Sequence, residues 1–180
     1  MTVTVAAPLI VAERLETERM VLRRPALEDF DGLHAFSASE RTVFTGGPRS
    51  RRLSFDRLTA FAGHWLMRGY GRYIICNKAE GLRPMGHVGV FQHDDTFPPE
   101  LAWTIWSPED EGRGFARESA AEVIRHFRQD TALPMLVAII HPDNAGSIAV
   151  ARALGGALSA TPAWRDDLLR FDFPLRAEAA

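Results

Sequence analysis

Apolar residues recur along the chain at two spacings, which predict alternating strands and helices. Between residues 115 and 127 they recur every three or four positions, as in a helix that buries one face, and Phe115, Val123 and Phe127 lie on that face. Other stretches alternate or are apolar throughout, as strands are. The predicted strands cover residues 19–23, 70–77, 85–93, 100–106 and 135–140.

Capping and breaking residues place the remaining elements. A helix is expected over residues 27–38, and Ser50 can cap a longer one that ends at Gly69. Its predicted apolar face consists of Leu53, Leu58, Phe61, Trp65 and Leu66. Asn144 can cap a last helix over residues 145–154, and residues 157–160 and 168–173 are expected to form a closing hairpin. The short connections within residues 70–106 imply an antiparallel meander, so the element order predicts an α/β layer with a mixed sheet.

Composition narrows the class of protein. At 180 residues, the chain is long enough for one domain with a substantial core, and a net charge of −2 argues against a nucleic-acid partner. Lys78 is the sole lysine, and because the many arginines are scattered we read them as a compositional bias of the genome rather than as a binding signal. The single cysteine, Cys76, excludes an internal disulfide and lies in an apolar run, which favours a buried structural thiol.

No segment has the features of a signal peptide or a membrane span. The short apolar run at the N-terminus lacks a basic flank and is interrupted by Pro8. A cytoplasmic protein with no membrane partner is therefore expected.

The segment Glu111 to Glu118 (EGRGFARE) raises the question of function. Two glycines, Gly112 and Gly114, stand where the helix begins, although glycine lowers helix stability. The first N–H groups of a helix have no intrahelical partner, and glycines let the backbone approach a ligand closely, so the segment can bind a phosphate or pyrophosphate. Such glycines can equally serve a tight turn. No P-loop and no G-x-G-x-x-G in a first βαβ unit is present.

Five motifs in this order resemble the GNAT superfamily of N-acetyltransferases, in particular the branch that acetylates the N-termini of ribosomal proteins. They are residues 15–23 (LETERMVLR), 44–48 (FTGGP), 86–90 (GHVGV), 108–116 (PEDEGRGFA) and 141–147 (HPDNAGS). The resemblance covers about Leu15 to about Phe173. It implies one α/β domain over residues 15–176 after an N-terminal arm over residues 1–14. Its mixed, mostly antiparallel sheet of about six or seven strands would be flanked by about four helices.

The resemblance also implies acetyl-CoA as cosubstrate and an amine as acceptor. The pyrophosphate would lie against the backbone of the loop, Trp106 would hold the acetyl end through its backbone, and Asn144 would reach the pantetheine arm. The expected cofactor-binding residues are Trp106, Glu111, Gly112, Arg113, Gly114, Phe115, Ala116, Arg117, Asn144 and Ser147. The family has Gln or Arg where this chain has Glu111, so we expect the Glu111 carboxylate to point into solvent, away from the phosphates.

Acetyl transfer to an amine needs a base for the amine proton and a donor for the departing thiolate. Glu100 matches the position of the base in relatives, although a solvated carboxylate at a strand start is an equal alternative. The usual tyrosine acid is replaced by Ala151, and Ser147 matches the serine assigned this role in the ribosomal-protein branch. His141 is a rival base, as His87 and His93 are. No histidine pair has metal-ligand spacing with a third partner, so no metal is expected.

The acceptor is the least defined part of the prediction. Aromatic residues Phe44, Trp103 and Trp164 are expected to line its pocket, and they could instead be core or surface residues. The acceptor is a protein N-terminus or a small-molecule amine, and the protein is a monomer or a homodimer. The alternative hypothesis is an acyl-CoA-binding regulatory module without catalysis, which the missing tyrosine at position 151 favours.

Overall fold

The computed structural model describes residues 11–176, and its elements follow the predicted order. The strands are β1 (Arg14–Glu16), β2 (Met20–Arg23), β3 (Arg72–Asn77), β4 (Arg83–Phe91), β5 (Glu100–Ile105), β6 (Met135–Ile140), β7 (Ala157–Leu158) and β8 (Leu169–Pro174). The α-helices are α1 (Phe30–Ser37), α2 (Arg51–Arg68), α3 (Phe115–Asp130) and α4 (Ala145–Ala153). The short 3₁₀ helices η2 (Glu40–Thr45) and η4 (Pro108–Asp110) lie beside the candidate site.

All the strands form a single sheet in the order β1-β2-β3-β4-β5-β6-β8-β7. The meander of β3, β4 and β5 is antiparallel, as predicted, and within residues 11–176 β5 with β6 is the one parallel pair. The α/β class and the mostly antiparallel sheet are confirmed. The sheet has eight strands, slightly more than the expected six or seven. The additional strand is β1, whose single apolar residue, Leu15, gives no alternation that could be recognised in the sequence.

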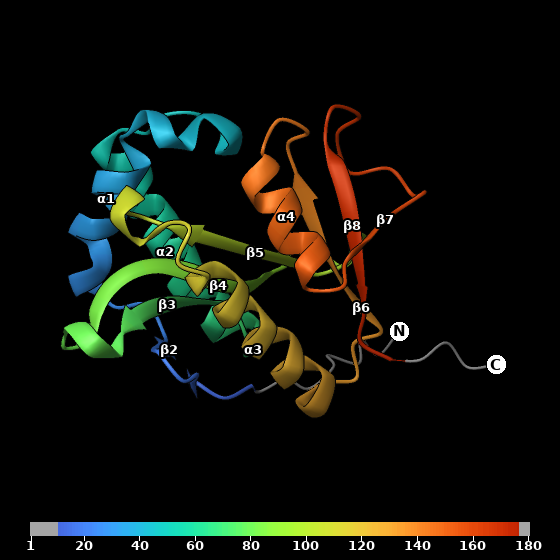
Figure 1. Cartoon of the computed structure of the whole chain (residues 1–180), viewed down its shortest axis with the longest axis horizontal. Coiled ribbons are helices and arrows are strands. Elements are labelled where there is room, and N and C mark those ends of the chain that lie inside the picture. Colours follow the sequence, from blue (N-terminus) through green and yellow to red (C-terminus); the bar gives the residue numbers. More distant parts are fainter. Residues whose placement is uncertain (1–10, 177–180) are drawn as a thin grey trace, which may run out of the picture.

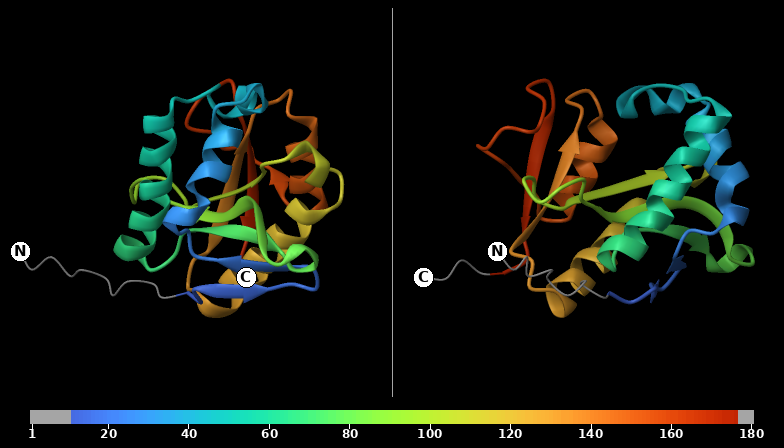
Figure 2. Two further views of the ribbon diagram at one scale, coloured as in Figure 1. Left: turned by 90° about the vertical axis from the view of Figure 1, so that its left-hand side faces the viewer. Right: turned by 180° about the vertical axis from the view of Figure 1, so that it is seen from behind.

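Side chains of β3 alternate between two hydrophobic cores on opposite faces of the sheet. Tyr73 and Ile75 enter the larger core with α3, whereas Ile74 and Cys76 pack with α1 and α2. In Figure 1, α3 and α4 lie in front of the sheet, and the view from behind in Figure 2 shows α2 covering the other face. The predicted burial of Cys76 is confirmed, and burial raises the pKa of its thiol.

The sequence predicted the ends of α2 correctly but predicted its buried face only in part. Ser50 accepts a hydrogen bond from the Leu53 N–H, and Gly69 ends α2 in the left-handed conformation, as predicted. The predicted apolar face of α2 is wrong at two positions, because Leu53 is 53% and Leu66 87% exposed. Leu58, Phe61 and Trp65 follow the helical spacing and are buried, and the other two residues fall outside that stripe.

Residues just before the expected domain start pack against the body of the protein. Val11 is buried in the larger core, and its N–H donates to the Gly69 carbonyl. The first ten residues of the predicted N-terminal arm lie outside the described residues. Between residues 11 and 176, no helix is long and apolar enough to cross a membrane.

The sheet opens between β5 and β6, and this opening positions the candidate site. The two strands are paired only at Glu100 and Val137, close to the start of β5. Beyond that point they run in different directions, as Figure 1 shows. The remainder of β5 pairs with β4 alone, so its other edge faces the opening with backbone groups that β6 does not use.

Candidate active site

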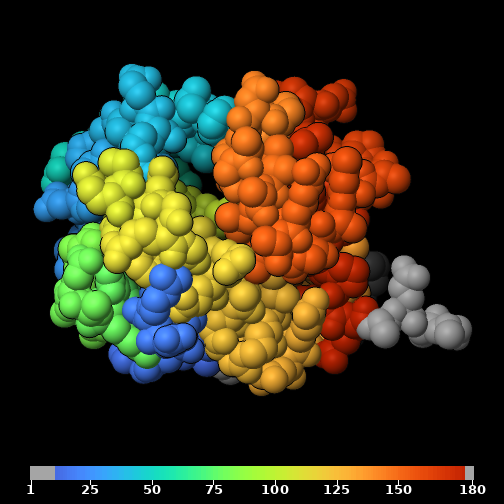
Figure 3. Space-filling view, in the orientation of Figure 1, coloured from blue at the N-terminus to red at the C-terminus, as the bar shows by residue number. Residues whose placement is uncertain are grey.

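A groove of about 840 Å³ lies between the glycine loop and α4. The space-filling view shows the hollow between the yellow segment that leads into α3 and the orange α4 (Figure 3). Its lining residues come from η2, the second half of β5, the loop, α3 and α4. They include Arg41, Phe44, Trp103, Ile105, Glu111, Gly112, Gly114, Phe115, Ala116, Arg117, Asn144 and Ser147.

The glycine loop ends in the open helix start that the sequence predicted. Gly112 and Gly114 have φ angles of 71° and 81°, which side chains rarely tolerate. Gly114 is the N-terminal cap of α3, and the first helical hydrogen bond runs from the Glu118 N–H to its carbonyl. The N–H groups of Phe115, Ala116 and Arg117 precede that bond and therefore have no intrahelical acceptor.

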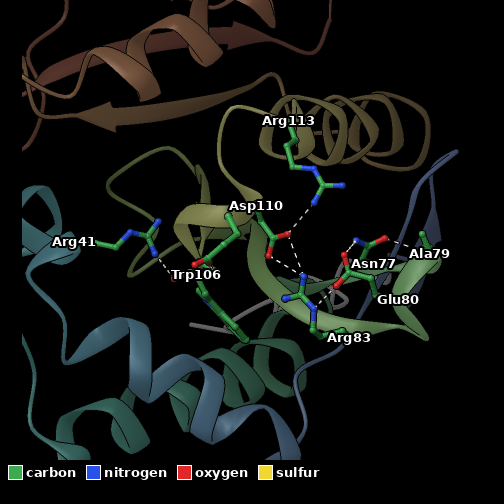
Figure 4. Close-up of polar contacts among 10 residues, drawn as sticks. Arg41, Asn77, Ala79, Glu80, Arg83, Trp106, Asp110 and Arg113 are labelled. Atoms are coloured by element: carbon green, nitrogen blue, oxygen red, sulfur yellow. Dashed lines mark hydrogen bonds and ion pairs between the residues drawn. The ribbon is translucent and has the colours of Figure 1, made fainter.

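Ion pairs to one buried carboxylate hold the base of this loop. Asp110, only 2% exposed in its side chain, accepts hydrogen bonds from Arg83 at 3.0 and 3.1 Å and lies 3.4 Å from Arg113. Figure 4 shows both arginines turned toward this carboxylate. The Arg113 side chain thus contacts Asp110 and the Phe115 ring and does not line the groove. Arg113 was among the expected cofactor-binding residues, and in this structure its charge is used within the loop.

Arg19 fastens the other side of the loop to the sheet. Its guanidinium donates to the Glu118 carboxylate at 2.7 Å and to the Arg113 carbonyl at 2.9 Å, and it lies over the Phe115 ring. Arg19 therefore ties the first turn of α3 to the start of β2.

The Glu111 carboxylate is held by Arg41 from η2 across the loop. The side chain is 57% exposed, in keeping with the expectation that it points into solvent, and the ion pair with Arg41 was not expected. Arg41 also donates to the carbonyls of Ile105 and Trp106, and Figure 4 shows it directed at Trp106. The Trp106 N–H donates to the Met85 carbonyl, so both backbone groups of Trp106 already have protein partners.

The Trp106 side chain belongs to the core on the α1 and α2 face. Its indole N–H donates to Nδ1 of His87 at 2.9 Å. His87 is fully buried, and burial holds the pKa of its imidazole well below the usual range, assisted by Arg57 and Arg72. The expectation that His87 is a rival base is wrong, because the middle of β4 directs it into the core, away from both cavities.

A second cavity, of about 530 Å³, adjoins the groove. It contains Glu100, Arg57, Arg72, His93, His141, Trp103, Trp164 and Arg165 in its wall. The Glu100 side chain is 24% exposed and lies 3.9 Å from Arg72. Burial raises the pKa of the Glu100 carboxyl, and the Arg72 guanidinium opposes that shift.

The groove and the second cavity meet at the opening between β5 and β6. Both are lined by Phe44, Trp103, Thr104, Asn144 and Ser147. Asn144 Oδ1 accepts the Ser147 N–H at 3.0 Å, so the predicted helix cap is present and fixes both residues at the junction. Two ligands, one in each cavity, would therefore come into contact at Ser147.

A family model of the acetyltransferase (GNAT) domain matches residues 19–157. The chain belongs to the GNAT acetyltransferase family. The resemblance read from the five sequence motifs is thereby confirmed. An acetyltransferase from Agrobacterium tumefaciens str. C58 is 31% identical and superimposes with a TM-score of 0.82, over 90% of this chain and 94% of that one.

More distant solved structures share the fold of this GNAT protein. A Bordetella pertussis protein assigned to the GnaT acetyltransferases is 24% identical, with a TM-score of 0.74 over 89% of this chain and 99% of that one. RimL, the ribosomal L7/L12 alpha-N-protein acetyltransferase, was solved in complex with coenzyme A. It is 15% identical, with a TM-score of 0.74 over 90% of this chain and 98% of that one. Relatives of the expected ribosomal-protein branch are thus among its structural neighbours.

The predicted site residues of this GNAT chain separate into two groups. The loop residues other than Arg113 line the groove, Glu100, His141 and Trp164 line the second cavity, and Asn144 and Ser147 line both. His141 Nδ1 accepts the Asp143 N–H, and its ring packs 5.3 Å from that of Phe44. Trp164 is 58% exposed at the rim. Among the described residues, no cluster of histidine, cysteine, aspartate or glutamate is arranged to hold a metal ion.

Sequence reasoning missed the arginines that shape this GNAT site. Arg19 and Arg83 hold the loop, Arg41 holds Glu111, and Arg57 and Arg72 line the second cavity. Their scatter along the chain gave no sign of a shared role. Arg19 could have been singled out because it lies in the first of the five motifs. The role of Arg19, however, depends on contacts with α3 that the sequence does not reveal.

Proposed function

We propose that this GNAT protein is an acetyl-CoA-dependent N-acetyltransferase that moves the acetyl group to a primary amine by direct attack, with both substrates bound. One observation carries the proposal: a groove with an open helix start meets a second, partly polar cavity at the break between β5 and β6. This arrangement supports binding of a long phosphate-bearing donor on one side and of an acceptor on the other.

The groove is suited to coenzyme A along its whole length. The N–H groups of Phe115, Ala116 and Arg117 are available for the pyrophosphate, with the positive end of the α3 dipole behind them. The carboxylate of Glu111 is neutralised by Arg41, which removes the repulsion that this unusual residue would otherwise cause. The free edge of β5 can pair with the amide groups of the pantetheine arm.

Bound acetyl-CoA supplies a thioester, whose carbonyl carbon reacts with a neutral amine. Transfer forms a C–N bond, breaks the C–S bond and releases one proton from the amine. We assign Glu100 as the acceptor of that proton, directly or through water, because its carboxylate lies in the acceptor cavity and burial raises its pKa toward that of a useful base. Ser147, at the junction, would donate a hydrogen bond to the departing sulfur. His141 is the rival base.

A thermal-shift screen tests the donor assignment. Acetyl-CoA and CoA should both raise the melting temperature, because a ligand that binds only the folded state stabilises it by mass action. The absence of any shift at millimolar acetyl-CoA would overturn the proposal. Stabilisation by acetyl-CoA without thiol release for any amine would instead point to an acyl-CoA-binding regulatory module.

A further inference from the structure

The wall of the acceptor cavity contains a pair of arginines but, among the described residues, a single carboxylate. Arg57 comes from the middle of α2 and Arg72 from the first position of β3, and both line the cavity. Both lie near Phe61, with guanidinium carbons 5.6 and 5.9 Å from its ring centre. Two segments far apart in sequence thus bring positive charge to one wall of the pocket.

One nitrogen of each arginine is buried and has no hydrogen-bond partner among the described residues. Between residues 11 and 176, neither Nη1 of Arg57 nor Nε of Arg72 has a hydrogen-bond partner. Arg72 is only 8% exposed, and its contact with Glu100, at 3.9 Å, is too long for a hydrogen bond. Burial lowers the pKa of Arg57 to about 10, with Arg72 and Arg49 contributing to the shift. A buried donor without a partner is costly, so its retention calls for an explanation.

The charges that face the pair leave a net positive cavity. Glu100 is the one carboxylate in the cavity wall as the structure describes it, and it faces Arg72. Arg165, at the rim, is paired with Asp167, and His93 and His141 add no negative charge. One unpaired positive charge therefore remains beside the carboxylate that we assign as the base.

We infer that the acceptor of this enzyme carries an oxyanion close to its amine, and that Arg57 and Arg72 bind that oxyanion. The inference rests on the proposed function, because it takes the second cavity as the acceptor site. Guanidinium groups bind carboxylate and phosphate in charge-assisted pairs, and the unused N–H groups would receive partners. Arg72 lies next to Glu100, so an anion on the arginines places a nearby amine at the base. A free amino acid, an amino phosphate and a peptide with an acidic first residue all present this chemistry.

Matched acceptors distinguish these sources. β-Alanine and O-phosphoethanolamine carry an anion near the amine, whereas β-alanine amide has the length of β-alanine and no negative charge. A peptide beginning with aspartate is compared with one beginning with asparagine. We expect kcat/KM, followed by thiol release, to be about 10- to 100-fold higher for the preferred anionic acceptor than for its neutral counterpart, as a charged hydrogen bond to a buried group provides.

Variants of Arg57 test whether the preference for an anionic acceptor arises in the cavity. Arg57→Gln should reduce the preference to within a few fold, mainly through KM for the acceptor, and Arg57→Lys should restore part of it. Arg52→Gln is the matched control, because Arg52 is exposed on the same helix and does not line the cavity. A binding readout accompanies the rates: the anionic acceptor should raise the melting temperature of the wild type and of Arg52→Gln, but not that of Arg57→Gln.

The outcomes separate this inference from the proposed function. Equal kcat/KM for charged and neutral acceptors, or a preference that survives in Arg57→Gln, overturns the oxyanion site while leaving acetyl transfer in place. Thermal stabilisation by anionic amines that depends on Arg57, without acetylation of any of them, supports the oxyanion site and rejects the transferase. A melting temperature of the folded wild type that no anionic amine changes also counts against the site.

Discussion

Replacing Glu100 with glutamine removes the proposed base while keeping the size of the side chain. In the structure this carboxylate lines the acceptor cavity, is 24% exposed and has one charged neighbour, Arg72, at 3.9 Å. Burial raises the pKa of Glu100 above its ordinary value, and Arg72 limits the shift. The raised pKa makes this carboxylate a stronger base than an ordinary glutamate.

The expected loss of kcat/KM in Glu100→Gln follows from the fraction of the acceptor amine that is already unprotonated. For an amine that titrates near 10, about one molecule in a thousand is unprotonated at pH 7. If the variant can use only that fraction, its kcat/KM should be lower by about 10³-fold, within the 10²–10⁴-fold range typical of general bases. The deficit should shrink about tenfold per pH unit as the pH approaches the amine pKa, because the acceptor then loses its proton without help.

The assay is kcat/KM against pH for the wild type, Glu100→Gln and His141→Ala. The wild-type rate should fall on the acid side as Glu100 becomes protonated, with a midpoint above the ordinary glutamate value because its pKa is raised. Glu100→Gln should lack this midpoint and instead lose rate about tenfold per pH unit below the amine pKa, whereas His141→Ala should keep the midpoint. A Glu100→Gln profile that coincides with that of the wild type refutes the assignment, and a flattened His141→Ala profile transfers the role to His141.

Other substitutions test the groove, the junction and the arginine pair. Gly114→Val should abolish acetyl-CoA binding in calorimetry, because a β-branched residue is strained at a φ of 81°. The fold should survive, since a Cβ added there would lie 3.5 Å from its nearest neighbour, the Arg19 guanidinium. Unchanged affinity would show that the loop is not the site. Ser147→Ala should lower kcat more than it raises the acetyl-CoA KM, since its contact with sulfur strengthens in the transition state; equal rates would reduce Ser147 to a helix residue. Arg57→Met should melt at pH 7 at the same temperature as the wild type or at a higher one. The reason is that the lowered pKa of Arg57 means that the fold disfavours its charge at any pH below about 10. A large drop in melting temperature would show that Arg57 serves stability instead.

Local sequence signals were sufficient for the elements of this fold. Ser50 and Asn144 cap helices through their own side chains, and Gly69 and Gly114 adopt the left-handed conformation at helix ends. Each of these features depends on a few adjacent residues, so the sequence reveals them directly. The buried runs of β3 and β6 were recognisable for the same reason.

The features that shape the site depend on contacts between distant segments. The single pairing of Glu100 with Val137, which opens the sheet, follows from how β5 and β6 pack on different helices. Arg57 and Arg72 look unrelated in sequence because one lies on a helix and the other begins a strand, yet they share one cavity wall. His87 was misplaced for a similar reason, since strand residues alternate faces and the sequence does not say which face is the cleft.

The reaction itself is the most direct test of the proposed function. Purified protein is incubated with acetyl-CoA and the panel of amines, free thiol is followed over time, and the amines are then analysed by mass spectrometry. We predict thiol release that depends on an added amine, with one acetyl group gained by an anionic amine for each thiol released. Thiol release that is the same with and without amines, or no release while acetyl-CoA binds in the groove, would contradict it.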